Sequence, residues 1–593
     1  MADGQGHRQR GEQSLSSSSS PISDRIAAKS LLGSVRMAAR VTPDLQPLIV
    51  GINLLALVSS AIQLMIPFLF GKSFSGLFSA EHSSTWVSNI YLLIFSGVAS
   101  AVLTGIESRL ALRLRHRSVM LLEVRSCEAL LNKPVFTVKA REAGELASHI
   151  NADVSATADL IVLQASLARI LMLTLGSLLI VSNISPPVGV AVFMVALVYC
   201  IIILRVTPRV AEAYRVASND TARSSSYFYQ LISAVLDIRV FGSQHFFLHA
   251  FDAKALRKAE AMILAGRLSK RLEQSSYVVQ LLGSFVILAA ATRYSDSKSL
   301  GMSGVLAAMG ILAFFWSSLR NGMTQWLNVR KNLPLIHRLQ AWLADTPLNT
   351  VDALSEKIAT VPPYALSFRD VSFRFPGADH DVFTRLNFDI AHGERVLLTG
   401  VNGAGKTTLM FLMLGLIEPT SGSVWIDGKL CQQFGEAAFR RLIVRVAHDG
   451  YLFPGSVEEN VIFGRAETLA SNSMSRAMDL SGCTVFAADS AIGEHGGRLS
   501  AGQRQRVLIA RALAGDAKIL LLDEATASID ADSAHAMYRK LLLETKNLGK
   551  TLIVTAHHSD YLTPMVDRHF NLADGRLQEE MIAFSRSAAT VVQ

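Results

Sequence analysis

The sequence predicts an α-helical membrane part followed by a soluble α/β part. Hydrophobic residues make up 50% of the 593 residues and charged residues only 18%, and the mean hydropathy is +0.33. Long apolar runs are confined to residues before 320, whereas short apolar strands alternate with helical stretches after 364. An average soluble domain carries about 25% charged residues. The composition therefore excludes a disordered protein and argues against a purely soluble enzyme.

Six apolar runs are long enough to cross a membrane, which takes about 20 residues. We expect spanning helices at about 45–70, 83–106, 159–183, 187–205, 274–292 and 299–319. The sequence Asn183-Ile184-Ser185-Pro186-Pro187 separates the third run from the fourth. Helices of a soluble core are the alternative, but six such runs make that alternative a poor explanation.

Composition also sets the expected domain boundaries. Residues 1–22 are rich in Ser, Gly, Gln and Arg and predict a disordered tail. The expected transmembrane domain, 23–345, opens with a basic amphipathic helix over 22–41 that suits a membrane surface. A polar linker at 346–363, a soluble domain at 364–580 and a C-terminal tail at 581–593 follow.

The formal net charge is +9, from 57 Lys and Arg against 48 Asp and Glu. Much of the excess lies in the long gaps after the second and fourth runs, which the positive-inside rule places in the cytoplasm with both termini. We therefore expect a lipid bilayer as partner and no nucleic acid. Four cysteines, Cys127, Cys200, Cys431 and Cys483, lack metal-site spacing and predict free, buried thiols facing a reducing compartment.

A phosphate-binding motif follows the apolar strand 396–399 and opens a helix at Thr408. Its residues, which match G-x-x-x-x-G-K-[ST], are Gly400, Val401, Asn402, Gly403, Ala404, Gly405, Lys406 and Thr407. Glycines let backbone N–H groups converge on phosphate oxygens at a helix N-terminus. We expect Lys406 to reach the β- and γ-phosphates and Thr407 to bind Mg²⁺. An ordinary Gly-rich turn is the alternative.

A second apolar strand, 519–522, ends in Asp523 and Glu524. A strand that is apolar on both faces is typical of a sheet covered by helices. We expect Asp523 to hold Mg²⁺ through water and Glu524 to take a proton from an attacking water. The alternative is a strand end of solvated acids. With the phosphate loop, the pattern predicts an α/β P-loop NTPase domain.

The segment Leu499-Ser500-Ala501-Gly502-Gln503, together with the loop and the two acids, resembles the signature motif of ATP-binding cassette (ABC) proteins. The resemblance implies that ATP is bound, with Phe375 on the adenine and His557 as the switch histidine. It also assigns ATP contacts to Thr408, Ser500, Gly502, Gln503 and Asp530.

The membrane part is similar to ABC exporters as well. Residues 143–153 and 236–242 resemble their cytoplasmic segments, and residues 493–496 resemble the loop with which exporters sense their membrane domain. The resemblance covers about 25–580 and implies an exporter-type half-transporter, with six spans fused to a C-terminal cassette.

Two residues depart from the family pattern. His448 stands where the family usually has the Gln that contacts Mg²⁺ and the attacking water. A neutral imidazole can ligate a metal or hydrogen-bond to water, so His448 is a candidate for both roles, and acidic pH is expected to lower activity. Ala501 replaces the usual Gly, but Ser500 and Gly502 remain, and we expect activity to be retained.

The resemblance implies a dimer, because ATP in this family lies between the phosphate loop of one cassette and the signature motif of the other. One chain has one of each. We expect a second copy of this chain as the partner, with a heterodimer as the alternative.

Candidate substrate contacts lie in the spans. Arg169 falls within the third span, where a charge costs about 2.5–3.5 kcal/mol on insertion scales and normally faces a cavity or a partner. The alternatives are a structural salt bridge or a position below the membrane. Weaker candidates, for which helix–helix hydrogen bonds are the alternative, are Gln63, Tyr277, Gln280, Trp316, Arg320 and Asn321.

These expectations combine into ATP-driven export of a small peptide, lipid or amphipathic compound, most simply across a bacterial inner membrane. The alternatives are an importer on an exporter scaffold, a degenerate subunit of a heterodimeric transporter, and a soluble cassette protein. The segment before the first span is short, so no leader-cleaving peptidase domain is expected.

Overall fold

A computed structural model of the chain divides into two compact units, Met1–Thr346 and Pro347–Gln593. The structure describes residues 43–78, 84–133, 143–294, 302–344, 364–431, 434, 439, 441–465, 471–485, 487–526, 528–556 and 561–581. The expected N-terminal tail, the amphipathic segment 22–41, the linker 346–363 and nearly all of the C-terminal tail lie outside the described residues. Each unit has its own apolar core.

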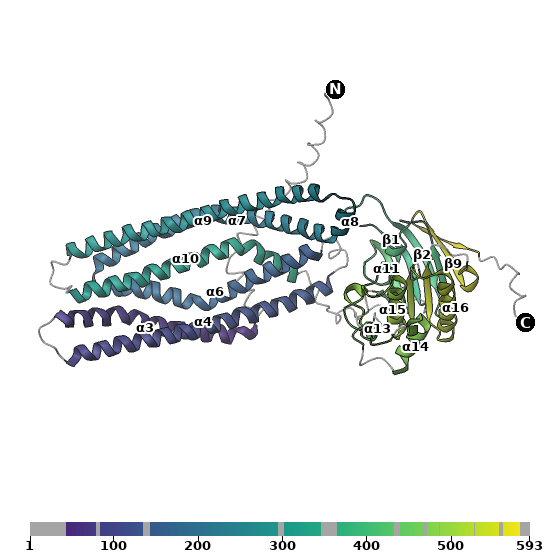
Figure 1. The fold of residues 1–593 in the computed structure, drawn as a ribbon, viewed down its shortest axis with the longest axis horizontal. Coiled ribbons are helices and arrows are strands. Elements are labelled where there is room, and N and C mark those ends of the chain that lie inside the picture. The colour runs from purple at the N-terminus through teal and green to yellow at the C-terminus, as the bar shows by residue number, and fades with distance from the viewer. Residues whose placement is uncertain are drawn as a thin grey trace, which may run out of the picture. The chain divides into compact units, whose positions relative to one another are not determined.

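The first unit is a bundle of long helices (Figure 1). Their bounds, with one 3₁₀ turn and one short helix, are η1 Pro43–Leu45, α3 Gln46–Phe78, α4 Ser84–Asn132, α6 Ala143–Ile184, α7 Pro186–Ser233, α8 Val235–Val240, α9 Gln244–Tyr294 and α10 Met302–Ala344. Extensive contacts pair α7 with α9, α6 with α10, and α3 with α4. The 42 residues of α6 extend about 63 Å at 1.5 Å per residue. That is about twice the thickness of a bilayer core, so these helices continue well beyond any membrane-embedded stretch.

Each of the six expected spans overlaps a different one of these helices, most of which are much longer than the span. Among the described residues, four helical stretches are long and apolar enough to cross a membrane: Pro43–Phe74, Trp86–Asn132, Ile150–Asn183 and Pro186–Ser233. They contain the first four expected spans, apart from the first residues of the second. The fifth and sixth expected spans lie on α9 and α10 and stay predictions.

The helix is interrupted between the third and fourth expected spans at the predicted place. Helix α6 ends at Ile184 and α7 begins at Pro186. Ser185 between them has an extended backbone, with φ −151°. Proline lacks an N–H group and cannot continue α6, but it suits the first position of a new helix. Sequence-local chemistry therefore explains this turn.

One expectation about the cysteines is wrong. All four are free and Cys483 is buried, but Cys200 and Cys431 are only half-buried, and Cys127 on α4 is exposed. A helix that runs past the membrane has a solvent-facing side, so a cysteine in a long helix is not buried by default.

The second unit contains two β-sheets, and its strands pair within each sheet. One has the order β2-β1-β4-β5 with antiparallel pairs, and the other has the order β10-β9-β3-β8-β7-β6, parallel except for β10. The strands are β1 Leu366–Phe373, β2 Phe383–Ile390, β3 Arg395–Thr399, β4 Ser421–Ile426, β5 Lys429–Leu430, β6 Ile443–Val446, β7 Ile519–Asp523, β8 Thr551–Thr555, β9 Arg568–Ala573 and β10 Arg576–Glu580.

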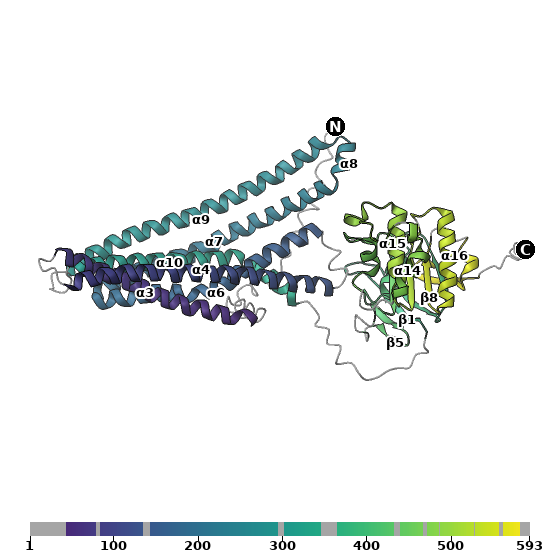
Figure 2. The same ribbon diagram turned by 60° about the horizontal axis from the view of Figure 1, so that its bottom comes forward.

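Helices cover the larger sheet. They are α11 Lys406–Met413, α13 Val457–Ile462, α14 Ser471–Ser481, α15 Ala501–Leu513 and α16 Ala531–Asn547, with 3₁₀ turns η3 Cys483–Val485, η4 Glu494–Gly496 and η5 Thr563–Met565. Figure 2 shows α14, α15 and α16 close to β8. Their apolar faces share one core with β7 and β8, which includes Ile509, Tyr538 and Leu520. Strand β7 is buried along its whole length, as a sheet covered by helices requires.

Four parallel strands bring the expected site residues to one edge. Strands β3, β8, β7 and β6 are neighbours in that order. Their carboxyl ends are Thr399, Thr555, Asp523 and Val446. Parallel strands end on the same side of a sheet, and ligands of open α/β sheets bind at that side. The phosphate loop and the two acids therefore meet at the carboxyl edge.

Candidate functional site

The phosphate loop connects β3 to α11, and its backbone has a shape that only glycine tolerates. Gly400 has φ 149° and Gly405 has φ 100°. A Cβ atom on Gly400 would lie 2.5 Å from the carbonyl oxygen of Leu572, and one on Gly405 would lie 2.9 Å from the Phe383 ring. Larger residues at these two positions would clash with neighbouring strands, so glycine lets the loop keep the curled backbone cradle that a phosphate site needs.

Lys406 begins α11 and is buried. Its Nζ donates to the carbonyl oxygens of Gly400 at 2.7 Å and Val401 at 3.4 Å, so the ammonium group lies over its own loop. Thr407 is exposed and Thr408 half-buried in the first turn, while Val401, Asn402 and Gly403 are exposed at the loop tip and Ala404 is half-buried. A phosphate that enters the cradle meets a cation already held in place.

The two acids at the end of β7 are held by β8. Thr555 donates its hydroxyl to Oδ1 of Asp523 at 3.0 Å. The backbone N–H of Glu524 donates to the hydroxyl of Thr555 at 3.0 Å. Glu524 has φ 51°, a left-handed conformation that costs a non-glycine residue of order 1–3 kcal/mol. Strain at this position fits a functional role, because it turns Glu524 away from the line of the strand.

Arg445 on β6 is the second partner of Asp523. Its Nε lies 3.2 Å from Oδ2, and its Nη2 makes a closer contact with the same oxygen. The sequence pattern singles out neither Arg445 nor Thr555 as a site residue. Thr555 is the polar last residue of an apolar strand, just before the expected switch histidine, and this position could have indicated a role at the site. Arg445 interrupts the otherwise apolar β6, but only the strand order gives it a partner.

The signature residues form the start of α15. Ser500 caps the helix, accepting from the backbone N–H of Gln503 at 3.2 Å, and Gln503 Oε1 accepts from the N–H of Ser500 at 2.9 Å. This reciprocal pair is a capping box. A Cβ on Gly502 would lie 3.0 Å from the carbonyl oxygen of Ser528. Ala501 is exposed at the first helical position, where its methyl group meets no crowding from the helix.

Of the four remaining expected site residues, the structure describes three. Asp530 caps α16, and hydrogen bonds from Ser533 lower the pKa of its carboxyl group. Phe375 is half-buried and packs edge-on against Phe373, with ring centroids 5.1 Å apart. His448 lies on an exposed turn that follows β6. His557 lies outside the described residues.

The structure brings some of these residues together and leaves others apart. Asp523, Glu524 and Thr555 form one connected group. Among the described residues no hydrogen bond joins Ser500 or Gln503 to the loop 400–407. Within the described residues, the phosphate loop and the signature motif are therefore not joined by hydrogen bonds.

The carboxyl edge suits a nucleoside triphosphate with Mg²⁺. The glycine cradle, Lys406 and the start of α11 are suited to phosphates. Mg²⁺ at such sites takes one or two carboxylates together with substrate phosphates and waters, so Asp523 and the Thr407 hydroxyl are a fitting donor set. In the described part of the chain there is no group of three His, Cys, Asp or Glu for a metal held by protein alone.

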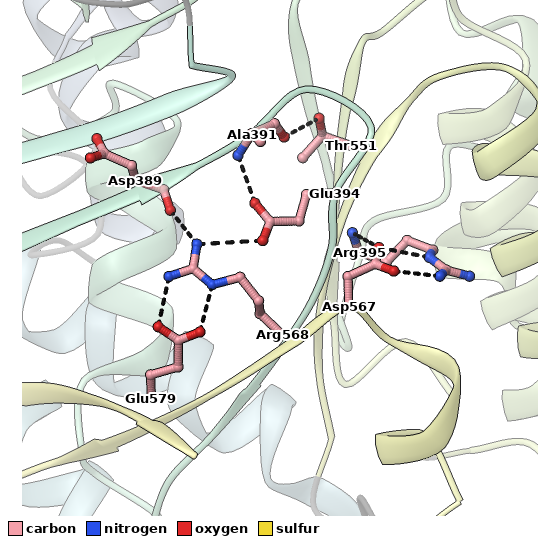
Figure 3. Close-up of polar contacts among 8 residues, drawn as sticks. All are labelled: Asp389, Ala391, Glu394, Arg395, Thr551, Asp567, Arg568 and Glu579. Atoms are coloured by element: carbon pink, nitrogen blue, oxygen red, sulfur yellow. Dashed lines mark hydrogen bonds and ion pairs between the residues drawn. The ribbon is translucent and has the colours of Figure 1, made fainter. Parts of the chain in front are cut away.

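A cavity of the cassette lies at the opposite edge of the sheet, where β3 and β9 begin. It measures about 530 Å³ and is lined by Tyr364, Phe388, Phe570 and Arg568, among others. Arg568 donates to both carboxylate oxygens of Glu579 at 2.8 Å and also contacts Glu394 and the carbonyl of Asp389 (Figure 3). Its guanidinium is already satisfied. This cluster ties strands together and is remote from the phosphate loop.

In the membrane unit, Arg169 has a partner on another helix. It donates to Oε2 of Glu107 on α4 at 2.6 Å, to Thr104 at 3.1 Å and to Ser59 on α3 at 3.3 Å. Glu107 is buried. Of the interpretations left open by the sequence, the structure provides the salt bridge, and a substrate contact by Arg169 stays a prediction.

The weaker substrate candidates are mostly engaged with neighbouring residues. Gln63 donates to Thr104 at 3.3 Å, and Arg320 lies over the ring of Tyr277 at 5.0 Å. Trp316 is buried against Phe315 and Tyr199. Gln280 is half-buried and Asn321 exposed. Their role in substrate binding also stays a prediction.

Comparison with known families assigns both units. A family model described as "ABC transporter transmembrane region" matches residues 49–319, and one described as "ABC transporter" matches residues 383–527. The chain belongs to the ABC transporter family. The order of the two regions, membrane region first and one cassette after it, makes it a half-transporter of the exporter type. The predicted family and fold class are confirmed.

A solved structure supports the exporter fold over nearly the whole chain. It is that of a bacterial Atm1-family ABC exporter with ATP bound, with a TM-score of 0.80 and 20% identity, covering 90% of this chain and 95% of that one. At this identity the likeness shows the fold alone.

Curated relatives include proteins of different named roles. A probable microcin-H47 secretion/processing ATP-binding protein of Escherichia coli is 30% identical over 376 residues, 60% of this chain and 51% of that protein. An ATP-dependent lipid A-core flippase of Burkholderia orbicola is 35% identical over 219 residues, 36% of either chain. Antigen peptide transporter 2 of Rattus norvegicus is 26% identical over 580 residues, 92% of this chain and 77% of that protein. The chain thus spans about half or less of the first two.

Proposed function

We propose that this half-transporter hydrolyses ATP at its carboxyl edge and uses the energy to export a substrate from the cytoplasm. One observation carries the proposal. The phosphate loop with Lys406, and the pair Asp523 and Glu524 held by Thr555, lie at one sheet edge of a chain that also supplies membrane-spanning helices. A cassette that had lost hydrolysis would have no need to keep Glu524 in a strained conformation.

The chain's own residues divide the work at this edge. Lys406 and the loop amides hold the phosphates, Phe375 supports the adenine, and Thr407 and Asp523 hold Mg²⁺, which when bound neutralises phosphate charge. Glu524 accepts a proton from the attacking water. His448 and His557 occupy the two further family positions that contact this water or the γ-phosphate. A degenerate subunit would lack several of these groups.

A second copy of the chain completes the site. Ser500 and Gln503 are arranged by their capping box, and in the described part of the chain no hydrogen bond joins them to the loop 400–407. We infer that they close the phosphate loop of a partner cassette. All hydrolytic groups are present in this chain, so a homodimer is sufficient, and a heterodimer is the alternative.

Peptide is the substrate class that we propose. The relative aligned over 92% of this chain has peptide transport in its name, whereas lipid A-core flippases align over 36% to 63% of it. Lipid or another amphipathic compound is the alternative. No observation favours import. The basic stretch of α4 beyond the second expected span, which includes Arg109, Arg113 and Arg115, supports a cytoplasmic cassette and termini. A bacterial inner membrane is the proposed location.

Hydrolysis is tested with Glu524→Gln in the full-length protein in lipid nanodiscs. We expect ATP turnover to fall by at least about 100-fold, the usual contribution of a general base, while binding of a fluorescent ATP analogue is kept. Glu579→Gln, which alters an exposed carboxylate of the remote Arg568 cluster, is the matched control and should keep wild-type turnover. Wild type without ATPase activity, or activity insensitive to Glu524→Gln, would refute the proposal.

Substrate class is tested in proteoliposomes, and dimerisation is tested in nanodiscs. ATP-dependent uptake of a fluorescent peptide library into inside-out vesicles, absent with Glu524→Gln, is the expected result. Flipping of a fluorescent lipid without peptide uptake would make lipid the substrate class. A protein that remains a single subunit in nanodiscs with ATP bound would refute the composite site.

A further inference from the structure

Arg445 is placed to act on the nucleotide site through Asp523. Strands β6 and β7 are parallel neighbours with Arg445 opposite Leu521, so Asp523 lies two residues further along the adjacent strand. A long side chain reaches this diagonal position. Nε and Nη2 of Arg445 both contact Oδ2 of Asp523, and Thr555 contacts Oδ1. Both oxygens of the carboxylate are therefore fixed.

The guanidinium also contacts the helix that follows the phosphate loop. It lies 5.2 Å from the centroid of the Phe411 ring on α11. Side-chain exposure is 18% for Arg445 and 9% for Asp523. A guanidinium stays protonated at all physiological pH values. The guanidinium of Arg445 is thus a permanent, largely buried cation next to the carboxylate assigned to Mg²⁺.

The electrostatic consequence follows from where the charges lie. A buried carboxylate without a counter-ion is costly and repels the phosphates of an incoming nucleotide. Here Arg445 cancels that charge before any metal arrives, because it is part of the sheet.

We propose that Arg445 is a positioning residue that keeps Asp523 oriented and charge-compensated, so that this cassette binds ATP with only a weak dependence on Mg²⁺. The inference rests on the proposed ATP site and names its regulation by metal. The competing explanation is a plain structural tie between strands. Arg395 and Asp567 form such a tie in the same sheet, at the start of β3, with Arg395 15% exposed.

The experiment measures the dissociation constant of trinitrophenyl-ATP in excess EDTA and in excess Mg²⁺, with full-length protein in nanodiscs. The ratio of the two constants is the readout, because a merely structural role would not move it. Coupling between two ligands of one protein is typically 5–150-fold, and we expect a wild-type ratio below about ten. Arg445→Gln should raise the ratio about tenfold by weakening binding in EDTA. Arg445→Lys, which keeps a point charge, should give an intermediate ratio.

Arg395→Gln is the matched control, because it removes a similarly buried arginine from an arginine–aspartate pair of the same sheet, far from the phosphate loop, and it should keep the wild-type ratio. An unchanged ratio in Arg445→Gln would overturn the inference. If Arg445→Gln does not fold, wild type decides alone, since a ratio above about 100 would mean strong metal coupling. A wild type that fails to bind trinitrophenyl-ATP even with Mg²⁺ would instead overturn the proposed ATP site.

Discussion

Arg338 on α10 donates two hydrogen bonds to Asp153 on α6, each 2.6 Å long and each to a different carboxylate oxygen. Asp153 is 5% exposed and Arg338 38%. The fork geometry fixes the relative register of the two helices. Asp153 is the last residue of the segment 143–153, which resembles a cytoplasmic stretch of exporters.

Arg338→Ala should destabilise the membrane unit by about 2 kcal/mol. Removing one partner of a buried pair typically costs 3–5 kcal/mol, and the partial exposure of Arg338 lowers that figure. Thermal unfolding in nanodiscs, followed by tryptophan fluorescence, measures the loss. Lys270→Ala breaks the exposed Lys270–Glu273 pair and is the control, and it should leave the unfolding temperature unchanged. Equal effects of the two variants would show that the fork adds nothing.

The Arg169–Glu107 pair should behave as a unit. Arg169→Gln leaves a buried carboxylate without its counter-ion and should cost about 3 kcal/mol, visible as a lower unfolding temperature and a lower folded yield. Adding Glu107→Gln should restore most of the loss, because two neutral amides need no charge compensation. Size-exclusion profiles and thermal scans of the single and double variants provide the comparison.

The double variant also tests the role of Arg169 in transport. We expect it to keep transport, because the structure already provides Arg169 with a partner. Restored stability with transport lost would contradict this prediction and would show that Arg169 contacts the substrate.

Sequence and structure agree where the signal is local. The phosphate loop, the apolar strand before Asp523 and the Pro186 break all rest on neighbouring residues in the chain. Contacts between distant strands are different. Thr555 reaches Asp523 only because β8 lies beside β7, and Arg445 does so only because β6 lies on the other side. Nothing in the pattern of a single strand encodes its neighbours, so these two contacts could not be predicted from the sequence.

The membrane unit shows the same limit. Arg169 was recognisable as a charge in an apolar run, but its partner Glu107 is 62 residues away on another helix. The expected burial of Cys127 was wrong for a related reason, since helix α4 continues far past its apolar run. Periodicity predicts that a helix forms, but it does not predict which side of it a neighbour covers.

Thiol reactivity should differ sharply between the cysteines. Burial raises the pKa of Cys431 to about 12 and that of Cys483 to about 11. Thiolate is the reactive form, so at pH 8 roughly one in a thousand Cys483 side chains, and fewer of Cys431, is reactive. Cys127 is exposed. A short pulse of N-ethylmaleimide followed by mass spectrometry should modify Cys127 and leave the two cassette thiols intact. In guanidinium chloride all three should react, and modification of the two cassette thiols in the folded protein as fast as Cys127 would contradict the structure.

The Arg395–Asp567 pair should make cassette stability depend on pH in the acidic range. Arg395 donates to both carboxylate oxygens of Asp567, at 2.9 Å and 2.6 Å, and these hydrogen bonds lower the pKa of that carboxyl group. A lowered native pKa means that the stabilisation is complete above the unfolded value near 3.9 and is lost as the pH falls through the native value. Asp567 is 42% exposed, so solvent screening limits the contribution to about 0.5–1 kcal/mol.

Asp567→Asn should therefore unfold at a lower temperature than wild type at pH 7, and the difference should shrink as the pH is lowered below 4. Thermal scans of both proteins in nanodiscs across this range provide the test. Asp379→Asn, which alters an exposed acid for which no ion pair is found among the described residues, is the control and should track wild type at every pH. Protonation of Asp567 removes the negative charge that pairs with Arg395. A wild-type advantage that persists or grows in acid would therefore contradict this prediction and would mean that Asp567 stabilises the fold by its shape and hydrogen bonds alone.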